Sequence, residues 1–124
     1  MLVAHSLGCI AIAHWAQEHG LVSGRIAAAM LVAPADVEAL MAPEPVHGFR
    51  PIPLVPFGFP SVVVASHTDD YVTFDRAAAF ARAWGSALED MGDAGHINTD
   101  AGFGPWPAGE RILRELLARI GKNT

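Results

Sequence analysis

Ser6 lies between a short apolar stretch, Met1–Ala4, and a longer apolar segment that begins at Leu7. If the first forms a strand and the second a helix, the serine falls on the sharp turn between them, with its hydroxyl projecting above the sheet edge. Such a turn needs small residues two positions to either side, and Ala4 and Gly8 are small, although glycine is more usual at the first position. The N–H of Leu7, at the positive end of the helix, would point into the same space. The pattern predicts a nucleophile at Ser6 and an oxyanion donor at Leu7; the alternative is that Ser6 only caps the helix.

Two further groups with reactive side chains follow later apolar stretches. The segment Ser66–Val72 comes directly after a valine-rich stretch and contains the neighbouring carboxylates Asp69 and Asp70. The segment Gly92–Asn98 sets His96 among glycines, where an imidazole is exposed for proton transfer. A carboxylate near it could orient and stabilise an imidazolium. Taken alone, each segment also fits a plainer interpretation, namely turn-forming aspartates and a histidine on the surface.

The order of these candidates along the chain gives them more weight together than each has alone. A serine, an acid and a histidine follow one another in the order that α/β-hydrolases use, which differs from the chymotrypsin and subtilisin orders. Each candidate also follows a predicted strand. We therefore expect Ser6 as the nucleophile, Asp70 as the acid and His96 as the general base.

Apolar patterns define the elements that must position these residues. Continuous β-branched runs suggest strands covered on both faces, hence a parallel sheet. Stripes of apolar residues at helical spacing separate these runs. The expected strands are Met1–Ala4, Ala27–Ala33, Ser61–Ala65 and a short Ala87–Met91, and the expected helices are Leu7–Glu18, Phe74–Trp84 and a last one containing Ile112–Ile120. This alternation predicts an α/β fold, a three-layer sandwich around a parallel sheet.

The segment from Met41 to Pro60 is rich in proline, with three phenylalanines interleaved. Proline removes backbone donors and disfavours both helix and central strand. We expect an ordered apolar loop that lies over the sheet. It is either a long connector or one wall of a substrate site.

Composition excludes several classes of function. The chain has 124 residues, enough for one domain, and its net charge of −5 with scattered basic residues argues against binding of nucleic acid. No apolar run is long enough for a membrane helix, so no membrane association is expected. The single cysteine, Cys9, excludes an internal disulfide, and a reducing cytoplasm is the expected compartment.

Metal binding is not expected either. His5, His14, His19 and His67 have no acid or thiol partner at a recognisable ligand spacing. We therefore expect no metal.

Four segments together resemble a known family. Val3–Cys9, Ala65–Val72, Gly92–Asn98 and Gly102–Pro107 are similar to the small serine hydrolases that resemble retinoblastoma-binding protein 9, in their bacterial YdeN-like branch. The resemblance covers most of the chain. It implies an α/β-hydrolase fold with little or no lid, and a Ser-Asp-His triad that works without a cofactor.

Carried over motif by motif, the resemblance places the serine on Ser6 and the histidine on His96. The acid falls on Asp70, because the family usually has Asn-Asp-Pro where this chain has Asp69, Asp70 and Tyr71. The tyrosine is a departure from that pattern, so Asp69 stays open as the acid. Asp36, after the second strand, is a further candidate.

The start of the chain also departs from the family, in which a substantial segment precedes the turn that carries the serine. We therefore expect residues 1–124 to form one N-terminally truncated domain, the C-terminal part of the α/β-hydrolase fold. Truncation would remove a second oxyanion donor and expose a sheet edge through which copies of the chain could associate. The expected function is hydrolysis of an ester or amide bond in a small molecule, with His5 and Tyr71 contacting the substrate. The alternative is a non-catalytic interaction module that keeps the hydrolase pattern.

Overall fold

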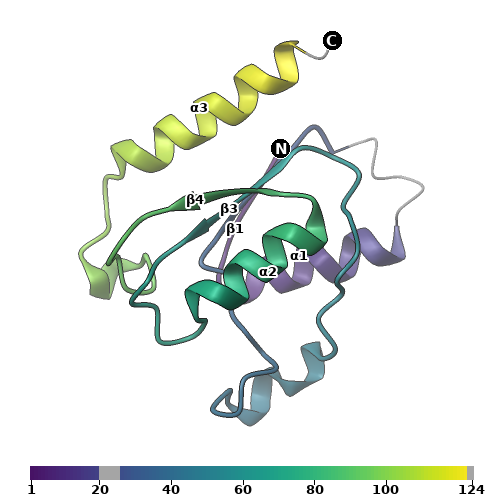
Figure 1. Cartoon of the computed structure of the whole chain (residues 1–124), viewed down its shortest axis with the longest axis vertical. Helices are drawn as coiled ribbons and strands as arrows, with labels where there is room; N and C mark the ends of the chain where they lie inside the picture. The colour runs from purple at the N-terminus through teal and green to yellow at the C-terminus, as the bar shows by residue number, and fades with distance from the viewer. Residues whose placement is uncertain (20–25, 123–124) are drawn as a thin grey trace.

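The computed structural model describes residues 1–19 and 26–122. Helices and strands alternate along the chain, as the apolar patterns predict (Figure 1). In chain order the elements are β1 (Leu2–His5), α1 (Leu7–Glu18), β2 (Ala29–Val32), the short 3-10 helix η2 (Glu44–Phe49), β3 (Ser61–Ala65), α2 (Phe74–Trp84), β4 (Ala87–Asp90), the 3-10 turn η3 (Thr99–Ala101) and α3 (Pro107–Lys122).

The four strands form one parallel sheet in the order β1-β2-β3-β4. Leu2 pairs with Ala29 in the register of the first two strands, and Ala29 pairs in turn with Ser61. β2 and β3 are buried along their whole length, which explains why their sequences are continuously apolar rather than alternating. The predicted parallel sheet is confirmed.

Helices cover both faces of the sheet, which gives the predicted three layers. In Figure 1, α1 and α2 lie on one side of the sheet and α3 lies on the other. Alternate residues of β2 and β3 divide between two cores. The core under α1 and α2 includes Ile10, Leu31, Val63, Phe80 and Trp84, and the core under α3 includes Met30, Val32, Val64, Ile112 and Leu116. Among the residues that the structure describes, no helix is both long and apolar enough to cross a membrane.

The proline-rich segment is ordered, as expected, but it is not all loop. Residues Glu44–Phe49 form a 3-10 helix, with a proline in its first turn where a missing N–H costs nothing. Beyond it, the Trp84 Nε1–H donates to the carbonyl oxygen of Pro53 at 2.7 Å. Phe57 stacks on the Trp84 ring at 5.2 Å and on the Phe59 ring at 5.3 Å. These aromatic contacts attach the segment to α2.

The last helix begins earlier than its apolar stripe suggests. α3 starts at Pro107, a residue that favours the first helical position because its φ is already helical. Gly109 then lies against the face of the Trp106 indole, so closely that a Cβ on Gly109 would come within 2.1 Å of the ring. A glycine inside a helix is normally a cost. Here it is the residue that lets the helix and the tryptophan pack together.

We therefore expect Gly109→Ala to destabilise the protein by about 1–3 kcal/mol, because the indole must leave its place to make room. In an uncrowded helix the same change would stabilise it. Gly104→Ala is the matched control, since a Cβ there meets nothing within 4 Å. Thermal or urea unfolding of the two variants checks this, and a Gly109→Ala variant as stable as the control would contradict it.

Candidate functional site

Ser6 occupies the turn between β1 and α1 in a backbone conformation that side chains rarely adopt, with φ 58° and ψ −120°. Its N–H donates to the carbonyl oxygen of Val32 at 2.9 Å, which ties the turn to β2. A Cβ on Gly8 would lie 3.4 Å from the Cβ of Ala4, so the two small residues do allow the strand and the helix to approach. The turn therefore has the geometry of a nucleophile elbow.

The Ser6 hydroxyl meets an imidazole that is itself held by a carboxylate. His96 Nε2 lies 2.8 Å from Ser6 Oγ, and His96 Nδ1 lies 2.9 and 3.0 Å from the two oxygens of Asp69. A carboxylate only accepts hydrogen bonds, so Nδ1 carries the proton of a neutral ring and Nε2 is left to accept from Ser6. The Asp69 side chain is fully buried and that of His96 is 11% exposed. The arrangement can transfer a proton from the hydroxyl to the imidazole.

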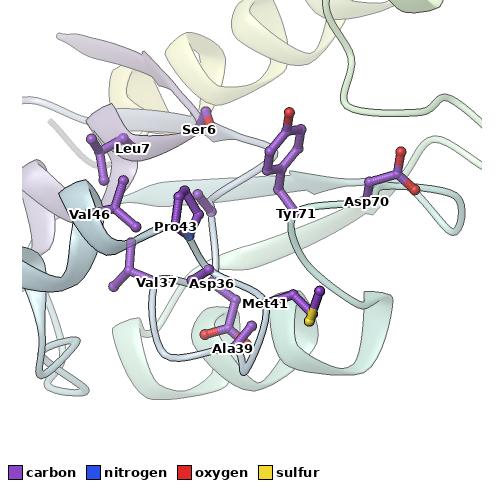
Figure 2. A pocket seen from close by; sticks show the side chains of 12 residues that line it. Ser6, Leu7, Asp36, Val37, Ala39, Met41, Pro43, Val46, Asp70 and Tyr71 are labelled. Atoms are coloured by element: carbon purple, nitrogen blue, oxygen red, sulfur yellow. The ribbon is translucent and has the colours of Figure 1, made fainter.

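The acid in contact with His96 is therefore Asp69, and the expected contact with Asp70 is wrong. Asp69 Oδ1 also accepts from the N–H of Tyr71 at 2.9 Å, a tight turn that directs this carboxylate inward and leaves its neighbour exposed. In Figure 2, Asp70 lies on the far side of Tyr71 from Ser6. Asp36 is also placed elsewhere, in a two-bond ion pair with Arg76.

Two hydroxyl residues, which the sequence analysis did not single out, join the acid-bearing loop to the histidine-bearing loop. Ser66 Oγ accepts from the N–H of Ala94 at 2.9 Å, and Thr68 Oγ1 accepts from the N–H of Gly95 at 2.9 Å. Ser66 is almost completely buried. A serine directly after a continuously apolar strand is the signal in the sequence that could have identified Ser66, because a hydroxyl buried there needs a hydrogen-bond partner.

The two residues expected to contact substrate both pack against His96. His5 Nε2 donates to the carbonyl oxygen of His96 at 2.8 Å, and the two rings lie 4.7 Å apart. The Tyr71 ring lies 4.5 Å from the imidazole and also lines the pocket beside Ser6. Tyr71 is therefore placed where a substrate could touch it, whereas His5 holds the backbone of the histidine loop.

A cavity of about 240 Å³ opens next to Ser6 (Figure 2). Most of its lining is apolar. The lining residues are Ser6, Leu7, Ala35, Asp36, Val37, Ala39, Met41, Ala42, Pro43, Val46, Asp70 and Tyr71. Four of these come from the start of the proline-rich segment, so that part of it does form a wall of the pocket.

Ion pairs hold another part of this wall, the turn that follows β2. Arg76 in α2 places Nε 3.0 Å from Asp36 Oδ2 and Nη2 3.0 Å from Glu38 Oε1. The hydrogen bond to the Asp36 carboxylate raises the pKa of Arg76, with a further contribution from Glu38. Asp36 is 8% exposed, and its burial is compensated by this bidentate pairing. The pair fixes the turn against α2.

Other reactive groups do not compete with this site. Burial raises the pKa of the Cys9 thiol, whose Sγ donates to the carbonyl oxygen of Val32 at 3.4 Å. A thiol is nucleophilic only as a thiolate, so Cys9 is a core residue. Within the described ranges, no three histidine, cysteine or acidic side chains are grouped so that they could hold a metal ion.

Comparison with known proteins finds one matching family and several structures with a similar fold. The family model described as serine hydrolase matches residues 1–115 of this chain. No curated protein matches the chain. Among solved structures, a YdeN-like hydrolase from Pectobacterium atrosepticum is 38% identical with a TM-score of 0.79, over 96% of this chain and 60% of that one.

Two more distant structures share the fold. An α/β serine hydrolase homologue from Coxiella burnetii is 23% identical with a TM-score of 0.56, over 94% of this chain and 46% of that one. Est1E from Butyrivibrio proteoclasticus is 16% identical with a TM-score of 0.60, over 94% of this chain and 60% of that one. This chain thus spans 46 to 60% of the length of these three structures.

The contact between His96 and Asp69 can be tested by NMR without any assay of activity. A ring N–H that donates to a buried carboxylate is strongly deshielded, so we expect a far-downfield proton resonance from His96 Nδ1–H. Asp69→Asn should abolish or markedly shift this resonance. Asp70→Asn, the matched control one residue away, should leave it in place. The reverse result would assign the contact to Asp70.

Proposed function

This chain belongs to the serine hydrolase family, and on that premise we propose that it cleaves ester or amide bonds of small molecules through an acyl-enzyme on Ser6. The observation that carries the proposal is the unbroken chain of hydrogen bonds from Ser6 through His96 to Asp69. A serine hydroxyl is a weak nucleophile unless a positioned base removes its proton. His96 Nε2, 2.8 Å from Oγ, is within reach of that proton.

In the first half of the reaction, Ser6 Oγ bonds to the substrate carbonyl carbon while its proton passes to His96 Nε2. Asp69 stabilises the resulting imidazolium through Nδ1–H. The carbonyl oxygen becomes an oxyanion. Leu7 is the first residue of α1, where N–H groups have no partner within the helix, so its N–H is available to donate to that oxyanion. One such donor is typically worth about 10²–10³ in rate.

In the second half, the tetrahedral intermediate collapses and the bond to the leaving group breaks. His96 returns its proton to the departing oxygen or nitrogen, which leaves an acyl group on Ser6. A water molecule then gives a proton to His96 and attacks the acyl carbon. The bond from the acyl carbon to Ser6 Oγ breaks, His96 returns the proton to Oγ, and the carboxylic acid leaves. This cycle uses only side chains, a backbone N–H and water, so it requires no cofactor.

A fluorophosphonate probe tests Ser6 directly. The probe should form a bond from Ser6 Oγ to phosphorus with loss of fluoride, whereas Ser6→Ala should not be labelled. His96→Ala should also lose labelling, and His67→Ala, a control in the neighbouring loop, should keep it. Equal labelling of the parent protein and Ser6→Ala would refute the nucleophile. A folded, unlabelled parent that forms specific oligomers would instead favour the interaction-module hypothesis.

Kinetics of ester hydrolysis should separate the two neighbouring carboxylates. We expect Asp69→Asn to lower kcat by about 10⁴-fold, because an amide leaves the imidazole in the wrong tautomer. Asp70→Asn should change kcat for an uncharged ester by less than about tenfold, since His96 is bonded to Asp69 and the exposed charge of Asp70 is partly screened by solvent. Circular dichroism controls for folding. A larger loss in Asp70→Asn than in Asp69→Asn would overturn the assignment of the acid.

A further inference from the structure

We propose that the cavity beside Ser6 receives the acyl part of the substrate, and that it selects short, uncharged, apolar acyl groups against acyl groups that carry a carboxylate. This inference rests on the proposed function. It adds to it the chemical class of the group that is transferred to Ser6.

The position of the cavity decides which half of the substrate enters it. The leaving group must depart next to His96, because His96 Nε2 supplies its proton. The cavity is lined by Ser6 and Leu7 and extends past Val37 to Val46. Tyr71, which packs against His96, also lines it, whereas His96 itself is not among the lining residues. The acyl group, on the other side of the scissile bond from His96, is therefore the part that faces the cavity.

The lining favours apolar groups. Hydrocarbon or thioether surface comes from Leu7, Val37, Met41, Pro43 and Val46, and three alanines also line the cavity. Burial of apolar surface stabilises a bound group by roughly 25 cal/mol per Å². The cavity of about 240 Å³ is smaller than the roughly 300–1,000 Å³ of pockets for drug-sized ligands. A short aliphatic chain fits these dimensions.

The charges around the cavity disfavour an anion. Asp36 and Asp70 both line it, and Glu38 lies next to Asp36. Among the described residues that line the cavity there is no lysine or arginine. The nearby cation Arg76 already contacts both oxygens of Asp36 and one oxygen of Glu38.

A second arginine near the cavity is also engaged by the protein. Arg50 donates hydrogen bonds to the backbone carbonyl oxygens of Val37 and Ala39, two residues that line the cavity. A substrate carboxylate would therefore be desolvated among acidic groups, with neither arginine free to pair with it. Both the desolvation and the like-charge repulsion oppose binding.

Two esters with acyl chains of equal length isolate the effect of a negative charge on the acyl group. 4-Nitrophenyl butyrate and 4-nitrophenyl hemisuccinate release the same 4-nitrophenol, and their acyl chains differ mainly in a terminal methyl or carboxylate. After subtraction of the uncatalysed rates, we expect kcat/KM to be at least about tenfold higher for butyrate, which corresponds to about 1.4 kcal/mol. Added salt should narrow the difference, because it screens exposed charges.

A charge placed in the lining should reverse part of this preference. Met41→Arg adds a cation at the mouth of the cavity, where Met41 is 92% exposed. It should raise kcat/KM for hemisuccinate relative to butyrate by several fold. Leu54→Arg is the matched control: it makes the same change of net charge at an exposed apolar residue that does not line the cavity. The ratio in that variant should equal that of the parent protein.

The outcomes separate the two proposals. If the parent protein hydrolyses neither ester and is not labelled by the fluorophosphonate, the proposed function fails. If it hydrolyses both esters equally well, the function stands and the charge selectivity of the cavity is overturned. If Leu54→Arg shifts the ratio as much as Met41→Arg does, the preference comes from net charge rather than from the cavity, and the proposal is likewise overturned.

Discussion

Parallel pairing of the strands sets the position of every residue in the site. In a parallel sheet all strands end at the same edge, so the loops that leave β1, β3 and β4 all emerge at that edge. Those three loops carry Ser6, Asp69 and His96, which are up to 90 residues apart in the chain. An antiparallel strand in this sheet would send one of the three loops to the opposite edge. The contact between serine, histidine and carboxylate depends on this shared direction.

Hydrogen bonds between side chains and the backbone then fix the loop that carries His96 relative to the neighbouring loops. The hydroxyl oxygens of Ser66 and Thr68 accept hydrogen bonds from backbone N–H groups of the loop that bears His96. His5 donates a hydrogen bond to the carbonyl oxygen of His96 itself. These bonds join three segments of the chain around one imidazole. Because each of them involves main-chain atoms of that loop, the side chain of His96 is left free to exchange its proton.

The sequence was sufficient for the main helices and strands, and it singled out two of the three side chains that the structure joins by hydrogen bonds, Ser6 and His96. Periodicity located α1, α2 and β3 at the ends that the structure has, because buried helices and strands differ strongly in apolar pattern. The choice between Asp69 and Asp70 was beyond it, since adjacent residues differ only in the direction that a tight turn gives them. One wall of the pocket could be proposed from the proline-rich segment, but the wall that Asp36 and Arg76 hold could not, because that pairing joins residues 40 positions apart.

The backbone conformation of Ser6 has a consequence for the stability of the fold. A residue with a side chain at φ 58° costs about 1–3 kcal/mol, a penalty that glycine largely avoids. Glycine at this position would therefore relieve the strain and stabilise the fold, but it would remove the hydroxyl that we propose as the nucleophile. A hydroxyl at this position therefore lowers the free energy of unfolding, and packing elsewhere in the sheet must compensate for that loss.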